Sequence, residues 1–356
     1  MSKGRVVVAM SGGVDSAVAA ALLKEAGYEV IGVTMRLWTL ETPGIPTAHR
    51  RCCSVEAIDD ARRVCQILDI PYYILNFEEE FQSHVVDYFC QEYARGRTPN
   101  PCIACNRHVK FNFLLEKALA LGADYLATGH YARIVEDDGK YRLLRAVDSS
   151  KDQSYVLYTL GQRELRHLVF PLGPLRKEDT RRKAAVLNLS VADKVESQDI
   201  CFITEGNYHV FLAERIASSP GELVDLAGRV MGRHRGVAFY TVGQRHGLGL
   251  ASREPLYVVA IDPADNRLVV GGREELLRDR LMAGDVSFVS GEAPATPLGV
   301  TAKIRYKSPE ARATLVCVNS RVEVRFAEPQ WAITPGQAVV FYLGEEVLGG
   351  GTIEWC

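Results

Sequence analysis

The stretch RVVVAMSGGVDS, residues 5–16, decides the fold expected for the first half of the chain. Residues 5–10 form a β-branched run typical of a buried strand, and residues 15–25 carry Ala, Val and Leu at helical spacing. The two glycines between them let the backbone turn tightly and approach an anion, and the flanking serines offer hydroxyl groups. The N-terminus of the helix adds N–H groups and a favourable dipole. The stretch therefore predicts a strand, a pyrophosphate-binding loop and a helix.

The loop at residues 11–16 differs from two common phosphate-binding motifs. It lacks the Gly-Lys-Ser/Thr of a Walker A loop, and it does not follow the Gly-x-Gly-x-x-Gly pattern of dinucleotide-binding proteins. An ordinary strand-to-helix turn with an Asp or Ser cap is the simpler alternative. The string resembles the PP-loop of the ATP pyrophosphatases, which cleave ATP between the α and β phosphates and leave AMP on a substrate oxygen. That resemblance implies that Asp15 helps to hold Mg²⁺ near the phosphates.

Short strand-like runs alternate with helical periodicity up to about residue 200. Further strands are predicted at residues 29–35, 72–76 and 125–128, and further helices at residues 54–68 and 114–121. This alternation predicts a parallel sheet covered by helices on both faces. Residues 131–145 instead predict a β-hairpin that turns at Asp138-Gly139.

Helical periodicity is lost beyond about residue 220. β-rich runs at residues 257–261, 267–270, 300–306, 313–318, 322–326 and 338–343 are separated by Gly, Pro and Asn turns. They predict one or two small β domains that include a barrel. The expected architecture is an α/β parallel-sheet PP-loop domain over residues 1–205, a central β-rich domain over residues 206–275 and a C-terminal β-barrel over residues 276–356.

The composition limits the classes to which the protein can belong. The chain has 356 residues, 47% of them hydrophobic and 24% charged, as in soluble proteins of two or three domains. No apolar run approaches the ~18 residues needed to span a bilayer, and residues 1–5 lead into a strand instead of a signal peptide. We therefore expect a cytoplasmic protein with no membrane partner. Because the net charge is −2, a nucleic acid would have to bind through local basic patches.

Two basic patches are present. Residues 228–249, GRVMGRHRGVAFYTVGQRHGLG, contain four arginines, two histidines and no acid, interleaved with Phe239 and Tyr240. Cations beside aromatic rings are typical of single-stranded RNA recognition, although a solvated β face over core aromatics is the plainer alternative. A second patch, Arg176-Lys177 and residues 181–183, lies on a predicted helix and could follow a tRNA backbone. His130 comes just after a predicted strand, where ligands gather in parallel sheets.

Nine cysteines without regular spacing do not indicate a secreted disulfide framework. Cys102 and Cys105 form a Cys-x-x-Cys pair, which suits zinc, redox or iron–sulfur chemistry, but no second pair at this spacing completes a structural zinc site. The adjacent Cys52 and Cys53 could supply a fourth ligand only by folding back. Cys201 follows a polar segment near the end of the α/β region. The remaining cysteines are expected in the core or as bystanders: Cys65, Cys90, Cys317 and Cys356.

Eight motifs then occur along the full length of the chain: SGGVDSAVAA, GVTMRLW, RTPNPCxxCNRHVKF, ATGHYAR, KDQSYVLYTL, ESQDICFI, YTVGQRHGLG and KIRY. In this order and spacing they resemble one family, the tRNA-specific 2-thiouridylases. The resemblance implies an ATP-dependent enzyme that adenylates the C2 oxygen of the wobble uridine, U34, of tRNA. It further implies that sulfur from a cysteine persulfide replaces that oxygen, with release of AMP and pyrophosphate.

The resemblance also implies roles for individual residues. Cys201 resembles the persulfide-bearing cysteine and Cys105 its partner nucleophile. The segment of Asn100, Pro101 and Cys102 resembles the contact to the target base. The other expected contacts are to ATP through Ala9, Met10, Ser11, Gly12, Gly13, Val14, Asp15, Ser16, Met35 and Gly129, and to tRNA through Lys151, Asp152, Gln153, Arg305 and Tyr306.

Cys102 departs from the family pattern. Many members carry Asp at this position, so an acid–base role of that carboxylate cannot be transferred to this chain. In the expected cycle, Cys105 attacks the S–S bond on Cys201 and leaves a disulfide for a reductant to reopen. A cysteine desulfurase or a sulfur relay protein would supply the sulfur. Alternatively, Cys102, Cys105 and Cys201 could hold an iron–sulfur cluster with one open iron.

Three cations lie close to these cysteines in the sequence. Arg107, His108 and Lys110 could stabilise the thiolates or contact tRNA phosphates. Two other functions stay open. An amide-forming synthetase would use the same loop with ammonia or an amine as nucleophile, but it would leave the three cysteines without a role. A non-catalytic RNA-binding protein would not need an intact SGGVDS loop.

Overall fold

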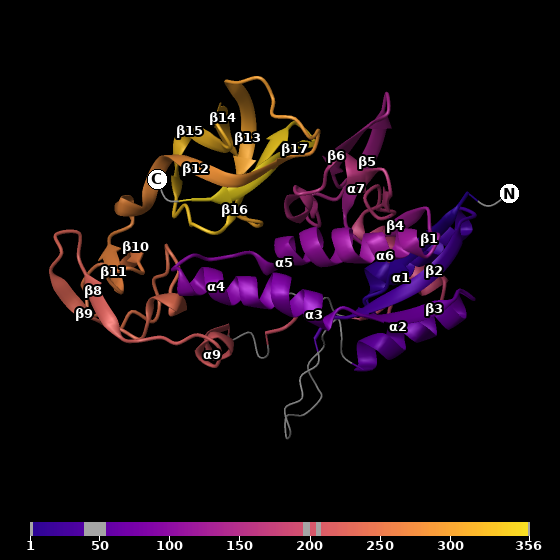
Figure 1. The fold of residues 1–356 in the computed structure, drawn as a ribbon, viewed down its shortest axis with the longest axis horizontal. Coiled ribbons are helices and arrows are strands. Elements are labelled where there is room, and N and C mark those ends of the chain that lie inside the picture. The colour runs from indigo at the N-terminus through magenta and orange to yellow at the C-terminus, as the bar shows by residue number, and fades with distance from the viewer. Residues whose placement is uncertain (1–2, 39–54, 195–199, 204–207, 355–356) are drawn as a thin grey trace.

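The computed structural model describes residues 3–38, 55–194, 200–203 and 208–354. Figure 1 shows a sheet-and-helix domain, a small β domain at one end and a barrel above both. Cys52, Cys53, Cys356 and residues 196–199 of the ESQDICFI motif lie outside the described residues.

The first domain is built on a five-stranded sheet in the order β3-β2-β1-β4-β7, with every neighbouring pair parallel. Val6 and Val8 of the first strand belong to one core cluster, and Val7 belongs to the other. Since successive side chains of a strand point to opposite faces, this confirms the predicted sheet with two covered faces. The strands are β1 (Arg5–Ala9), β2 (Glu29–Arg36), β3 (Tyr72–Asn76), β4 (Tyr125–Ala127) and β7 (Leu168–Val169).

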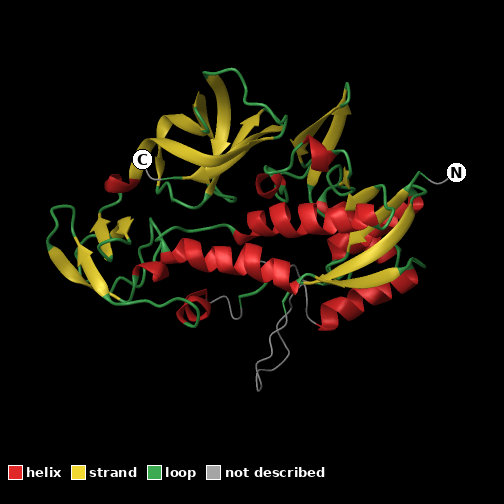
Figure 2. Cartoon of the chain, viewed as in Figure 1, coloured by secondary structure: helices red, strands yellow, loops and turns green. Residues whose placement is uncertain are grey.

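Helices α1 (Val14–Glu25), α2 (Val55–Ile67) and α8 (Lys177–Val186) contribute Ala17, Ala61 and Ala184 to the cluster on one face of the sheet. Two long helical rods cover the other face and run side by side across the molecule (Figure 2). No helix within the described ranges is long and apolar enough to cross a membrane. The first rod joins α3 (Glu78–Phe81), the π-helical η1 (Gln82–Asp87) and α4 (Tyr88–Ala94), and the second joins α5 (Pro101–Ala104), the π-helical η2 (Cys105–Leu114) and α6 (Leu115–Ala120).

The rest of the chain is β-rich, as predicted. A four-stranded sheet in the order β10-β11-β8-β9 forms the central domain, and six strands form a barrel that the β12–β17 pairing closes. The central strands are β8 (Gly221–Val224), β9 (Val230–His234), β10 (Tyr257–Asp262) and β11 (Arg267–Gly271). The barrel strands are β12 (Leu277–Phe288), β13 (Leu298–Lys303), β14 (Ala311–Val318), β15 (Arg321–Trp331), β16 (Ala338–Leu343) and β17 (Glu346–Ile353). The short helices are η3 (Ser154–Leu157), α7 (Gln162–Leu165), α9 (Tyr208–Ala213), η5 (Val237–Phe239) and η6 (Glu274–Leu276).

The predicted hairpin forms, but it joins the barrel sheet. Strands β5 (Ala132–Asp137) and β6 (Lys140–Arg145) are connected by Asp138 and Gly139, both at positive φ. β6 pairs with β17 of the barrel, and the Arg133 guanidinium forms a 2.9 Å ion pair with Glu345. A hairpin of the first domain therefore connects that domain to the barrel at the far end of the chain.

The segment around Thr98, which connects the two rods, contacts both the barrel and the central domain. Thr98 donates its backbone N–H to the carbonyl of Pro335 at 2.9 Å, and its carbonyl accepts the Gln337 side-chain amide at 2.8 Å. The Thr98 hydroxyl lies 3.0 Å from the hydroxyl of Thr241 in the central domain. Two residues later, Asn100 begins the second rod.

Candidate functional site

Hydrogen bonds of its own serines and a close contact with the neighbouring helix α2 fix the conformation of the phosphate loop. Gly13 caps α1, and the Ser16 hydroxyl accepts the Ser11 N–H at 3.2 Å and donates to the Gly13 carbonyl at 3.1 Å. Gly12 has φ +68°, and a Cβ there would lie 2.2 Å from the carbonyl oxygen of Ala57. The glycine is therefore required by both the turn and the contact with α2. The first-turn N–H groups of α1, which helix geometry leaves without intrahelical partners, follow this loop directly.

The residues expected to bind ATP gather at the carboxyl edge of the parallel sheet. The loop follows β1, Met35 lies near the end of β2, and Gly129 follows β4. Because β2 and β4 lie on opposite sides of β1, this edge is the switch point where ligands bind in such sheets. A Cβ on Gly129 would lie 2.8 Å from the backbone of Asp15 and Ser16. Gly129 thus lets β4 approach the start of α1.

Lys177 lies in this site. Its Nζ donates to both carboxylate oxygens of Asp15 at 2.7 and 2.8 Å, and its side chain is only 10% exposed. The Tyr131 hydroxyl lies 2.9 Å from Asp15 Oδ1 and 3.0 Å from the Thr180 hydroxyl. The expectation that Lys177 follows a tRNA backbone is therefore wrong, because the helix turns this cation inward. Its spacing to Thr180 and Ala184, all three buried, was the signal in the sequence that marks an inner helix face.

Three further cations of the second basic patch contact groups within the protein. Arg181 donates to the Ala192 carbonyl at 3.0 Å, Arg182 pairs with Asp179, and Lys183 pairs with Glu25 at 2.8 Å. These contacts neutralise or satisfy the cations locally. Arg176 and Arg182 are exposed, so the prediction that they follow a tRNA backbone stays a prediction.

Asp15 is the carboxylate of the loop that could bind Mg²⁺. Mg²⁺ is typically held by one or two carboxylates together with substrate phosphates and water. The loop and its first-turn Asp15 fit this requirement.

Lys194 is a site residue that the sequence analysis missed. Its Nζ donates to the Gly12 carbonyl at 2.8 Å and pairs with Asp60 of α2 at 2.6 Å. Lys194 stands seven residues before Cys201. The phosphate loop is thus tied to the chain that leads to this cysteine.

His130 packs among aromatic rings beside the end of β4. It lies between the rings of Phe111 and Phe170, 5.7 and 5.9 Å away, and its Nδ1 is 2.6 Å from the Thr128 hydroxyl. Desolvation, followed by the charge of Lys110, lowers the pKa of His130 well below its usual range. His130 therefore lies beside the expected ATP site, as its position after β4 indicated, and the lowered pKa favours its neutral form.

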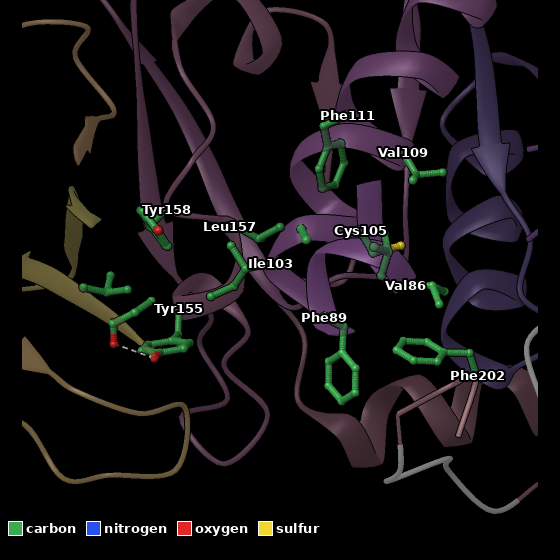
Figure 3. Packing of buried hydrophobic residues seen from close by; sticks show 14 of the residues in the cluster. Val86, Phe89, Ile103, Cys105, Val109, Phe111, Tyr155, Leu157, Tyr158 and Phe202 are labelled. Atoms are coloured by element: carbon green, nitrogen blue, oxygen red, sulfur yellow. Dashed lines mark hydrogen bonds between the residues drawn. The ribbon is translucent and has the colours of Figure 1, made fainter. Parts of the chain in front are cut away.

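The three cysteines differ in exposure. Cys102 is exposed in the first turn of α5, where Asn100 caps the helix by accepting the Cys102 N–H at 3.1 Å. Cys105 begins η2 and is buried, and Cys201 is half-buried against the same core cluster. In Figure 3 the Cys105 sulfur points to the side of its helix on which Val86 and Phe202 lie. Folding thus brings residues 105 and 202, far apart in the chain, to one region of the core.

A small cavity of about 200 Å³ opens beside the segment expected to contact the target base. Its wall includes Asn100, Arg107, His108, Tyr158 and Asp285. It therefore lies between the start of the second rod and the barrel.

The three cations near Cys105 in the sequence are engaged with other groups. Arg107 forms an ion pair with Asp285 of β12, and Lys110 donates to the Asn106 side chain at 2.9 Å. His108 stacks on His84, with centroids 5.0 Å apart, and burial followed by the Arg107 charge lowers its pKa. These contacts fix where the three side chains lie, and their role toward the thiolates or toward tRNA stays a prediction.

The iron–sulfur alternative requires several metal-ligating side chains to lie close together. Across the described residues, no group of three or more Cys, His, Asp or Glu side chains is arranged to hold a metal ion. As placed, Cys102, Cys105 and Cys201 do not fit an iron–sulfur cluster. Cys65 is buried as expected, and burial raises its pKa to about 12.

The residues expected to contact tRNA fall into two groups. Asp152 accepts the backbone N–H groups of Ala146 and Ser154, and Gln153 accepts that of Tyr131, so both brace the loop that also carries the half-buried Lys151. Arg305 donates to the Thr334 hydroxyl at 3.0 Å, and Tyr306 lies 5.9 Å from the ring of Tyr155. Arg305 lies near Thr98, because both side chains line one cavity.

The first basic patch, residues 228–249, contains both buried and exposed side chains. Phe239 and Tyr240 are 7% and 4% exposed, so the prediction that they stack on bases is wrong, because both rings pack into the core. His234 is buried as well, and desolvation lowers its pKa. Arg245 and His246 stay exposed.

Comparisons with known proteins agree along the whole chain. Family models described as the tRNA methyl transferase HUP domain, the tRNA methyl transferase PRC-barrel domain and the aminomethyltransferase beta-barrel domain match residues 4–205, 209–272 and 278–353. A tRNA-specific 2-thiouridylase MnmA from Moorella thermoacetica is 55% identical over 98% of this chain and 99% of its own length. Namesakes from Carboxydothermus hydrogenoformans and Clostridium perfringens are 53% and 49% identical, each over 99% of this chain and 98% and 99% of their own lengths. The chain therefore belongs to the family of the tRNA-specific 2-thiouridylases.

Proposed function

We propose that this protein replaces the C2 oxygen of the wobble uridine of tRNA with sulfur in an ATP-dependent reaction. The observation that carries the proposal is the identity of 49–55%, over nearly the full length, with proteins named for this activity. The phosphate loop at the switch point of the sheet supports the ATP-dependent step. The Cys105 sulfur points to the side of its helix on which Phe202 lies, and Phe202 follows Cys201 in the chain, which supports the sulfur step.

In the first step, the uridine C2 oxygen attacks the α phosphorus of ATP, and pyrophosphate leaves. The loop and the start of α1 bind the phosphates through N–H groups and hold the α phosphorus in line with the attacking oxygen. Mg²⁺, when bound through Asp15, neutralises negative charge on the phosphates. Lys177 supplies the cation that the loop itself lacks, because it reaches Asp15 from a buried position on α8.

In the second step, the terminal sulfur of a Cys201 persulfide attacks the activated C2, and AMP leaves with the original oxygen. The base is then joined to Cys201 through an S–S bond. The Cys105 thiolate attacks the Cys201 sulfur, so a Cys105–Cys201 disulfide forms and the second sulfur stays on the base as the thiocarbonyl. A dithiol reductant supplies two electrons to reopen the disulfide. A sulfur-donor protein, a cysteine desulfurase or a relay protein, recharges Cys201.

The test measures each product separately. The protein is incubated with ATP, Mg²⁺, an unmodified tRNA transcript and a persulfide donor, and 2-thiouridine, AMP and pyrophosphate are then quantified. We expect Cys201→Ala and Cys105→Ala to abolish 2-thiouridine. Cys317→Ala, which changes a half-buried cysteine in the barrel, is the matched control and should retain activity.

Other outcomes would contradict the proposal in distinguishable ways. AMP formation that depends on an amine instead of tRNA would indicate an amide-forming synthetase. Tight tRNA binding without ATP cleavage would indicate a non-catalytic RNA-binding protein. Activity that requires iron in anaerobically prepared protein, and vanishes with its removal, would contradict the disulfide cycle.

A further inference from the structure

Cys102 and Cys105 lie about one helical turn apart at the start of the second rod, and the proposed cycle uses Cys105 but not Cys102. Cys102 is exposed, whereas Cys105 is 7% exposed and packs in the core. Thiols in a Cys-x-x-Cys pair commonly exchange disulfides, and a reactive thiol is often accessible and placed next to a second cysteine. An accessible thiol therefore lies beside the buried one that the reaction oxidises.

The backbone of this turn brings the two side chains toward one another. The Cys105 N–H donates to the carbonyls of both Cys102 and Pro101. The Ile103 N–H likewise donates to the Asn100 carbonyl, at 3.2 Å. Bonds that reach back three residues give the turn 3₁₀ character, in which side chains at positions i and i+3 eclipse one another. Because helical side chains also tilt toward the N-terminus, the Cys105 side chain leans toward the turn that carries Cys102.

The remaining gap between the two thiols is small. Side chains three residues apart on a helix have Cβ atoms about 5–6 Å apart, whereas a disulfide needs about 3.5–4.5 Å. Cys102 lies in the first turn, where its N–H has no intrahelical partner and is held by the Asn100 side chain at 3.1 Å. Cys102 is therefore held less firmly than a residue in the middle of the rod, and a shift of about 1–2 Å allows the bond.

The disulfide that the proposed cycle leaves behind is poorly accessible. Cys201 is half-buried, and Phe202, which follows it in the chain, is 1% exposed and packs among other aromatic rings. The Cys105 sulfur points to the side of its helix on which Phe202 lies (Figure 3). Thiol–disulfide exchange requires that the attacking thiolate reach a sulfur atom. A reductant in solution therefore reaches Cys102 more readily than a Cys105–Cys201 bond.

We propose that Cys102 is a resolving thiol, which reopens the Cys105–Cys201 disulfide from within the protein. The inference rests on the proposed function, because that cycle produces this disulfide. The Cys102 thiol loses its proton and attacks the Cys105 sulfur, the Cys105–Cys201 bond breaks, and Cys201 leaves as a thiolate that can take up a proton. The exchange is neutral in electrons, since a Cys102–Cys105 disulfide replaces the first one. A dithiol reductant then attacks the Cys102 sulfur, becomes a disulfide itself and restores both thiols.

The disulfide present after one turnover tests the inference. Protein that carries a persulfide on Cys201 is mixed with ATP, Mg²⁺ and excess unmodified tRNA in the absence of reductant. The reaction is quenched with acid, and the protein is alkylated and mapped by peptide mass spectrometry. In the wild type we expect a Cys102–Cys105 disulfide and an alkylated Cys201. In Cys102→Ser we expect the same yield of 2-thiouridine from this turnover, but a Cys105–Cys201 disulfide.

Repeated turnover separates a resolving role from a structural one. With a protein dithiol as reductant, Cys102→Ser should form 2-thiouridine more slowly than the wild type after the first turnover. A small dithiol should restore much of the rate, because it can reach the half-buried Cys201 directly. Cys102 is exposed, so its replacement by Ser or Ala should not disturb folding. Cys90→Ala, which changes a half-buried thiol on α4, is the matched control and should keep the wild-type disulfide and rate.

Either of two results would overturn the inference. One is a wild-type protein that holds the Cys105–Cys201 disulfide after one turnover while Cys102 is alkylated. The other is a Cys102→Ser variant that turns over at the wild-type rate with the protein reductant.

A wild type that forms no 2-thiouridine would instead contradict the proposed function. The exchange between the thiols is then decided without tRNA, by mapping disulfides after equilibration with reduced and oxidised glutathione. A Cys102–Cys105 disulfide in the wild type and a Cys105–Cys201 disulfide in Cys102→Ser support the exchange, and any other distribution contradicts it.

Discussion

Replacement of Lys177 by Met tests whether the ATP step depends on a cation outside the loop. The ammonium lies 2.7 and 2.8 Å from the two Asp15 oxygens and is 10% exposed, whereas Asp15 is 31% exposed. Removal of one preorganised donor that stabilises charge in a transition state costs about 10²- to 10³-fold in kcat. We therefore expect Lys177→Met to slow tRNA-dependent AMP formation by this factor. Lys177→Arg keeps the charge and should recover part of the rate.

The same substitution has a smaller expected effect on stability. Asp15 keeps the Tyr131 hydroxyl at 2.9 Å and can take up water, so the loss should be about 1–3 kcal/mol in the free energy of unfolding. Lys183→Met is the matched control on the same helix, because its pair with Glu25 is 33% and 49% exposed and worth less than about 1 kcal/mol. AMP formation at the wild-type rate in Lys177→Met, measured with saturating ATP and Mg²⁺, would refute the reasoning.

Three further predictions concern the loop, a histidine and the thiols. Gly129→Ala should lower ATP affinity without unfolding the protein, because its Cβ would lie 2.8 Å from the backbone of α1, while Gly299→Ala, which has open space, should bind ATP normally in equilibrium titrations. Because the pKa of His130 is lowered in the folded state, the unfolded chain binds a proton at this residue at a pH where the folded chain does not. Stability should therefore fall as the pH drops below about 6.5, by up to about 1.4 kcal/mol per pH unit, and His130→Gln should flatten this slope in denaturant titrations from pH 8 to 5. Alkylation of the native protein at pH 8 should label the exposed Cys102 and spare Cys65, whose pKa burial raises to about 12; peptide mass spectrometry that finds equal labelling would contradict the buried position.

The sequence by itself determined the kind and order of the elements. β-branched runs, helical periodicity and the glycine-rich turn at residues 11–16 are local signals, since each depends on the backbone preferences of neighbouring residues. They predicted the parallel sheet, the loop before α1, the hairpin at Asp138-Gly139 and the barrel, and the structure confirms all four. Motif order also predicted the family, which the comparisons show.

Only the tertiary structure decided which side chains share a site. Lys177 looked like part of a surface patch, but the packing of α8 on α1 turns it onto Asp15. Phe239 and Tyr240 looked like base-stacking rings, yet both rings are buried in the core. The physical reason is that burial and ion pairing depend on contacts between segments far apart in the chain, and local periodicity carries no record of those partners.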